Sequence, residues 1–236
     1  MEVAGAELTH LLILDDDAVL SPGALDRLVG AMSTADATAA YPAVMSESGL
    51  VGWTPGLPEI SRRDYHRLNV PLALFRERCP RTTLYFTWAP GICLLVSRAA
   101  IVAAGYHRDD FWIRGEDLDF SLRITSAGRG VFVPEVLVEH LPPPMTSVGS
   151  QGEYLKHCAM LQNVAYIGCR LPHGHVIRKT IPGNTLRFLR TWGAKSLGDA
   201  LRALWRGAVQ SHPAGKGEGD TFLQRSANLH STKNVK

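Results

Sequence analysis

The sequence contains few cysteines, no long apolar run and no internal repeat. The four cysteines form no C-x-x-C pair and lie among apolar neighbours, as buried free thiols do; they are Cys79, Cys93, Cys158 and Cys169. The first ten residues carry acids in place of a basic segment, and the apolar run at 11–14 is far too short for a signal peptide or a membrane span. We therefore expect a protein of the reducing cytoplasm with no transmembrane segment.

Charge is distributed unevenly, although the formal net charge is only +3. Residues 1–153 hold 12 basic and 19 acidic side chains, a balance of −7, whereas residues 154–236 hold 13 and 3, a balance of +10. No recognised nucleic-acid-binding motif accompanies this basic excess, so we expect no nucleic-acid partner. The two halves are expected to face different partners.

The first element predicted is a strand at residues 10–14, where the apolar run HLLIL ends abruptly in Asp15, Asp16 and Asp17. This pattern is typical of a buried parallel strand, whose carboxyl end is where open α/β sheets bind ligands. Ser21 and Pro22 then provide an N-cap and a first-turn proline, which predicts a helix after the acidic triplet.

Further strands and helices are predicted along the chain. Residues 41–83, rich in proline, glycine and arginine, are expected to be irregular. A strand at 91–96 leads into a short helix that ends at Gly105, and a second helix runs from Glu116 to a stop at Gly128. Two short strands follow at 130–134 and 136–140. The order of these elements predicts an α/β fold.

The acidic triplet is the first candidate site. Three adjacent carboxylates repel one another unless a cation neutralises them, and oxygen ligands suit a hard divalent metal. Asp15 and Asp17, one residue apart, are placed to bind the same ion, which would bridge the phosphates of a diphosphate leaving group. The alternative is an acidic turn that caps a helix, and the triplet alone leaves both interpretations open.

Three later residues are candidates for the same site. His140 ends a predicted strand, where its imidazole would complete the metal ligands; alternatively it is a packing residue before a proline run. Glu116 and Asp117 open a helix, where acids also favour the positive end of the helix dipole. A carboxylate there would serve as the general base for an acceptor hydroxyl if it lay within hydrogen-bond reach.

Four segments, in this order, resemble the inverting GT-A glycosyltransferases of family 2, in particular the galactofuranosyl- and rhamnosyltransferase-like branch: LLILDDD, WAPGICLLVSR, FWIRGEDLDFSLRITSAG and VPEVLVEH. The resemblance covers about residues 10–145. It implies a GT-A (Rossmann-like) mixed sheet with flanking helices, a Mn²⁺ or Mg²⁺ cofactor, a nucleotide diphosphate sugar donor, and a glycan or lipid-linked acceptor such as a growing cell-wall glycan.

The resemblance also implies roles for individual residues. Asp15, Asp16 and Asp17 match the D-x-D motif that holds the nucleotide diphosphate through the metal, and His140 matches a third metal ligand. Asp117 matches the catalytic base and Glu116 its acidic neighbour. The acceptor site would be formed by aromatic and glycine positions beside these motifs, namely Trp88, Trp112 and Gly91. The reaction implied is a single in-line displacement with inversion at the anomeric carbon.

One departure from the family is that only fourteen residues precede Asp15, where the family has a nucleotide-binding region. We therefore expect a chain that lacks the N-terminal nucleotide-binding part, with a second polypeptide as a candidate to supply it. The alternative is a catalytically inactive glycosyltransferase remnant or partner-binding module. A phosphatase of the haloacid dehalogenase type ranks lower, because the triplet fits that motif only loosely and its later elements are not evident.

The domains expected are a catalytic domain at 1–150, a basic helical region at 151–212 and a disordered tail at 213–236. In the helical region, leucines and aromatics alternate with arginines over residues 186–206, which suits either an anionic membrane surface or packing on the catalytic domain. The first interpretation predicts a cytoplasmic protein that is peripheral at the inner face of the membrane.

Overall fold

The computed structural model describes residues 8–60, 70–80, 82–109, 111, 113–141, 151–171 and 173–209. The chain forms two compact units. The first comprises Met1–Tyr106 and Phe120–Pro144, and the second comprises His107–Asp119 and Met145–Lys236. The boundary therefore falls within a helix, and each unit is considered by itself.

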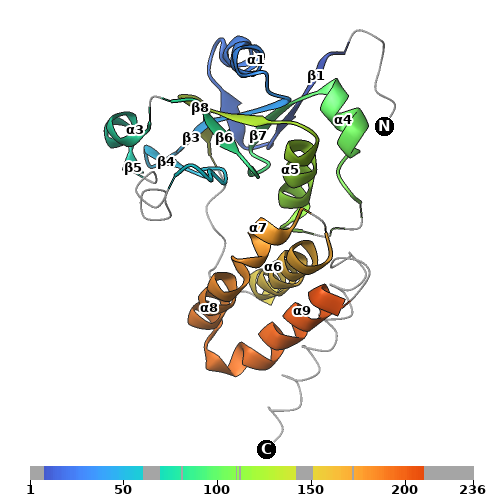
Figure 1. Cartoon of the computed structure of the whole chain (residues 1–236). Coiled ribbons are helices and arrows are strands. Elements are labelled where there is room, and N and C mark those ends of the chain that lie inside the picture. Colours follow the sequence, from blue (N-terminus) through green and yellow to red (C-terminus); the bar gives the residue numbers. More distant parts are fainter. Residues whose placement is uncertain are drawn as a thin grey trace, which may run out of the picture. The chain divides into compact units, whose positions relative to one another are not determined.

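The first unit contains one mixed sheet (Figure 1). Its described strands are β1 (His10–Leu14), β2 (Ala18–Leu20), β3 (Ala39–Ser46), β4 (Leu50–Gly52), β5 (Val70–Pro71), β6 (Leu84–Phe86), β7 (Cys93–Ser97) and β8 (Gly130–His140). The main path runs β1-β7-β3-β4-β5, and β8 pairs with β2, β3 and β6. The β3–β8 pair is parallel, whereas the other pairs are antiparallel.

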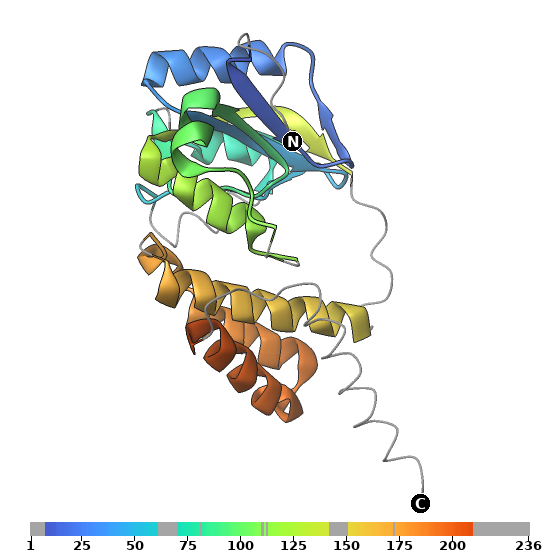
Figure 2. The same cartoon turned by 90° about the vertical axis from the view of Figure 1, so that its right-hand side faces the viewer.

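Helices flank this sheet: α1 (Ala24–Ala35), α3 (Leu72–Arg78), α4 (Arg98–Ala104) and α5 (Glu116–Ala127). Helix α1 lies on one face of the sheet, and α5 lies on the other (Figures 1 and 2). The core between these layers is built on β3, whose Tyr41 and Val44 are fully buried, together with Leu28 of α1 and Phe120 of α5. A mixed sheet with flanking helices confirms the predicted α/β class.

The prediction that residues 10–14 form a buried parallel strand is wrong in direction. Strand β1 pairs antiparallel with β7, with Leu12 opposite Leu95 and Leu14 opposite Cys93. Its side chains are only partly buried, and Leu14 is exposed. A short apolar run shows that a strand is buried on at least one face, but its direction depends on the partner strand, which the run itself does not specify.

The start of α1 also differs from the prediction. An additional strand, β2, follows the acidic triplet, and the helix begins at Ala24 after Gly23, which has a φ of 76° and makes no side-chain cap. Ser21 is instead held by backbone pairing, because its N–H donates to the carbonyl of Leu137 at 2.9 Å. Pairing with β8 thus extends the chain through the position where the cap was expected.

The prediction that residues 41–83 are irregular is wrong for much of the described part of this range, because β3, β4, β5 and α3 all have residues there. Residues 61–69 and 81 lie outside the described residues. The first six positions of β3 are buried between β7 and β8, so tertiary burial outweighs the presence of Pro42. The two strands predicted at 130–134 and 136–140 are the single strand β8. Its register with β3 shifts beside Pro42 and Ala43, which accommodates the break at Pro134.

The second unit contains the helices α6 (Gln151–Arg170), α7 (His175–Arg178), α8 (Ile181–Trp192) and α9 (Leu197–Val209), with a short 3-10 turn at Ala194–Ser196. The amphipathic run at residues 186–206 belongs to two helices, because Gly193, with a φ of 80°, ends α8. In the part of the chain that the structure describes, no helix is both long and apolar enough to cross a membrane.

Candidate metal centre

The pairing of β2 with β8 brings His140 to the acidic triplet. Ala18, the residue after Asp17, lies opposite His140 in the antiparallel register. The N–H of Leu141 also donates to the carbonyl of Asp17 at 2.9 Å, which continues the pairing into the turn. Two segments about 120 residues apart in the sequence are therefore joined by backbone hydrogen bonds at the site.

The other end of the triplet is held by β7. The N–H of Asp15 donates to the carbonyl of Ile92 at 3.0 Å, directly after the last paired residues of β1 and β7. Within the triplet, the N–H of Ala18 donates to the carbonyl of Asp15 at 3.1 Å and closes a tight turn. This turn puts the carboxylates of Asp15 and Asp17 on the side that faces His140.

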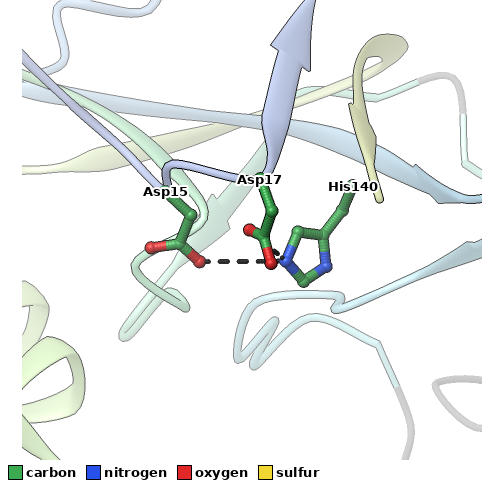
Figure 3. Close-up of side chains that lie close together, drawn as sticks. All are labelled: Asp15, Asp17 and His140. Carbon is green, nitrogen blue, oxygen red and sulfur yellow. Dashed lines mark ion pairs between the residues drawn. The ribbon is translucent and has the colours of Figure 1, made fainter. Parts of the chain in front are cut away.

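The three side chains converge on one point (Figure 3). Nε2 of His140 lies 2.9 Å from Oδ1 of Asp17 and 4.0 Å from Oδ2 of Asp15. One ligand atom from each residue lies within 4.8 Å of the other two. The side chain of His140 is 11% exposed, that of Asp17 26% and that of Asp15 46%, so the cluster is open to solvent on the Asp15 side.

The electrostatics of the cluster favour a cation. Burial, and after it the neighbouring Asp17 carboxylate, raise the pKa of Asp15 above its ordinary value, while His140 lowers it by a smaller amount. A raised carboxyl pKa means that the ionised form is disfavoured where it stands. A divalent ion between the two carboxylates and the imidazole would remove that cost, and two oxygens with one nitrogen are ligands that Mn²⁺ accepts.

The helix-cap alternative for the triplet has no support in the structure, because α1 begins at Ala24 and no side chain caps it. The triplet belongs to the turn between β1 and β2. Its middle residue, Asp16, is exposed and is not one of the three clustered ligands.

Trp53 is a member of the site that the sequence motifs did not reveal. Its ring stands edge-to-face with the imidazole of His140, with centroids 4.6 Å apart and an interplanar angle of 85°. Its backbone has a φ of 46°, which is costly for a bulky residue, and its carbonyl accepts a 3.1 Å hydrogen bond from the hydroxyl of buried Tyr41. An isolated tryptophan after a strand has no motif around it, so only the fold identifies it.

The acidic pair Glu116 and Asp117 belongs to the second unit and opens α5. Oδ1 of Asp117 accepts the N–H of Leu118 at 2.7 Å. Oε2 of Glu116 is buried and, among the described residues, has no hydrogen-bond partner. A buried carboxylate oxygen without a donor is uncommon in folded proteins.

A buried asparagine holds the loop that leads into this pair. Nδ2 of Asn163 on α6 donates to the carbonyls of Ile113 and Arg114 at 3.0 and 2.9 Å. Arg114 and Gly115 have φ values of 57° and 129°, and a Cβ added at Gly115 would lie 3.0 Å from that of Asn163. The backbone entering α5 is therefore fixed by its contact with α6, which the sequence did not predict.

The residues expected to bind the acceptor have different placements. The indole of Trp88 packs directly on Gly56, where a Cβ would lie only 2.1 Å from Nε1. Gly91 lies in the turn before β7, next to the Ile92 carbonyl that binds Asp15. Trp112 lies outside the described residues. The role of all three in acceptor binding remains a prediction.

No protein-family model matches the chain, and no characterised protein matches its sequence. A crystal structure of GalNAc-T7 with UDP, GalNAc and Mn²⁺ is similar, with a TM-score of 0.41 and 16% sequence identity. The match covers 80% of this chain and 42% of that chain, so the chain spans less than half of that structure's length.

Proposed function

We propose that the chain is a metal-dependent glycosyltransferase of the GT-A type, and that Asp15, Asp17 and His140 bind its divalent cation. The observation that carries the proposal is the convergence of these three ligands within 4.8 Å, from segments about 120 residues apart. Their order along the chain is also that of the family 2 motifs. The metal is Mn²⁺ or Mg²⁺, and the donor is a nucleotide diphosphate sugar.

In this proposal the cluster holds the leaving group. When bound, the metal would neutralise the charge that develops on the departing nucleoside diphosphate. Asp15, the most exposed of the three, faces the open side from which the phosphates would approach. The burial of His140 and its contact with Trp53 would keep the third ligand in a fixed orientation.

Asp117 is proposed as the general base, with Glu116 as its neighbour. Its carboxylate would take the proton from an acceptor hydroxyl, which then attacks the anomeric carbon and inverts it in one step. The helix N-terminus favours the ionised carboxylate, and the Asn163 contact fixes the backbone that carries it. The acceptor is a glycan or a lipid-linked sugar, bound with the help of Trp88 and Gly91.

The test is turnover of nucleotide sugars by the purified full chain. A panel of UDP-, GDP- and dTDP-sugars is incubated with Mn²⁺ and simple sugar acceptors, and release of the nucleoside diphosphate is measured. We expect release that EDTA abolishes and that Asp117→Asn lowers by about 100-fold or more. A matched control is Asp26→Asn, which removes a carboxylate from the first turn of α1 and should leave the rate unchanged.

Other outcomes of the same assay would overturn the proposal. Mn²⁺ binding without turnover of any donor would indicate an inactive remnant or a partner-binding module. EDTA-sensitive hydrolysis of an aryl phosphate, with no use of nucleotide sugars, would indicate a phosphatase. If turnover survives Asp117→Asn, the protein is still a glycosyltransferase, but Asp117 is not its general base.

A further inference from the structure

Helix α9 has two faces of opposite character. One face packs in the second unit, where Ala200, Ala203 and Gly207 are buried and α9 runs along α6. The opposite face carries a row of large apolar side chains spaced four residues apart, which we call the α9 stripe: Leu197, Leu201, Trp205 and Val209, exposed by 46%, 55%, 65% and 51%. At 1.5 Å per residue the stripe is about 18 Å long.

The structure separates the apolar residues of α8 and α9 into two groups. Phe188 is buried, and Leu189, Trp192 and Leu204 pack against the core of the second unit. The residues of the α9 stripe, in contrast, are exposed among the described residues. Four large exposed apolar residues on one helix face exceed what a solvated helix needs, and such a patch usually marks an interaction site.

The charge around the stripe is strongly positive. The described helical residues 151–171 and 173–209 contain nine basic and two acidic side chains, a balance of +7. Both acids are engaged within the unit: Glu153 pairs with Arg114 and Lys156, and Asp199 pairs with Arg202 and accepts the Tyr154 hydroxyl. Other basic residues are exposed, namely Arg187 and Arg190 of α8 and Lys195 of the 3-10 turn that follows it.

We propose that the α9 stripe inserts into the interface of an anionic lipid bilayer. A helix with apolar side chains on one face and arginines beside them lies in the plane of such an interface, with tryptophan at the level of the headgroups. The positive balance of these helices fits anionic phospholipid. A second copy of the chain fits poorly, because it would bring two positive surfaces together.

The experiment measures sedimentation of the full chain with lipid vesicles. Vesicles of phosphatidylcholine alone are compared with vesicles of phosphatidylcholine and phosphatidylglycerol in equal parts. We expect binding to the mixed vesicles only, weakened by raised salt, with a blue shift of tryptophan emission that Trp205→Phe removes. The variant Leu201→Ser with Trp205→Ser should lower the vesicle partition coefficient by about tenfold or more.

The controls separate the stripe from general effects. Val102→Ser removes the most exposed large apolar residue in the described part of the first unit, on α4, and should leave vesicle binding unchanged. Thermal unfolding of the Leu201/Trp205 variant should match that of the wild type, since both side chains point away from the core.

Two results would overturn the proposal. One is vesicle binding that is absent, or equal for neutral and anionic lipid. The other is a change of oligomeric state in the Leu201/Trp205 variant, which would make the stripe an interface between copies. Neither result bears on glycosyl transfer, because the assay uses no donor or acceptor.

Discussion

The indole of Trp53 stands edge-to-face against the imidazole of His140, with ring centroids 4.6 Å apart. His140 is also the candidate metal ligand whose other ring nitrogen, Nδ1, is buried without a hydrogen-bond partner among the described residues. A ligating histidine is normally oriented through that second nitrogen. Here the ring contact with Trp53, whose φ is 46°, lies where such an orienting partner would act.

Replacing Trp53 should therefore weaken metal binding although Trp53 supplies no ligand. We expect Trp53→Ala to raise the Kd for Mn²⁺ by about tenfold, the range found when residues that orient a ligand are removed. Trp53→Phe should recover most of the affinity, because an aromatic edge or face is kept. Calorimetric titration with MnCl₂ measures both, and Trp205→Ala in the other unit is the matched control. An unchanged Kd for Mn²⁺ in Trp53→Ala would show that Trp53 does not position His140 for metal binding.

Replacing Asp15 should stabilise the metal-free protein. The pKa of this carboxyl is raised in the fold, so its ionised form costs stability at every pH above that value. Asp15→Asn removes this cost, and we expect a higher Tm than wild type in EDTA at pH 7. The gain should shrink as the pH falls below the raised pKa, and it should vanish below the ordinary carboxyl pKa, where Asp15 is neutral in both the folded and the unfolded chain. A lower Tm for Asp15→Asn than for the wild type at pH 7 would show that the ionised Asp15 carboxylate does not destabilise the metal-free fold.

Bound metal should reverse the order of stability, so that the wild type becomes more stable than Asp15→Asn. For the wild-type chain, Mn²⁺ at about 100 times its Kd should add about 2.7 kcal/mol to the free energy of unfolding. Asp15→Asn should gain little, because it has lost a ligand. Thermal unfolding with and without Mn²⁺ measures the difference, and equal shifts for the two proteins would place the ion elsewhere.

The Asn163 contact should affect turnover but not metal binding. Asn163→Ala releases the carbonyls of Ile113 and Arg114, and a small displacement of Asp117 is expected to lower kcat by about 100-fold. Gly115→Ala should have the same effect, since a Cβ there meets Asn163 and the φ of 129° suits only glycine. The Kd for Mn²⁺ should stay at the wild-type value in both. Gln151→Ala, on the exposed surface of α6, is the control.

The sequence predicted correctly those features that depend on local patterns, such as helix ends and the candidate metal-binding residues. The helix Arg98–Ala104 is capped at its N-terminus by Ser97, whose hydroxyl accepts the N–H of Ala100. It is terminated by Gly105, as predicted. The α5 helix also lies where its pattern placed it. The three residues predicted to share a metal, Asp15, Asp17 and His140, do lie together.

The sequence failed where long-range pairing decides the structure. Strand β2 is only three residues long, yet its pairing with β8 both displaces the start of α1 and delivers His140 to the triplet. The contacts of Trp53 and Asn163 likewise join residues 87 and about 50 positions apart in the chain. No local periodicity encodes such contacts, because they form only when the sheet and helices have assembled.

The central claim is that Asp15, Asp17 and His140 bind one divalent cation, and calorimetric titration of the full chain with MnCl₂ tests it most directly. We expect one Mn²⁺ site per chain, which is lost in Asp17→Asn and in His140→Ala. The site should be retained in Glu139→Gln, where an exposed neighbour on the alternate face of β8 is changed. Mn²⁺ binding that persists unchanged in the double variant Asp17→Asn with His140→Ala would contradict the account.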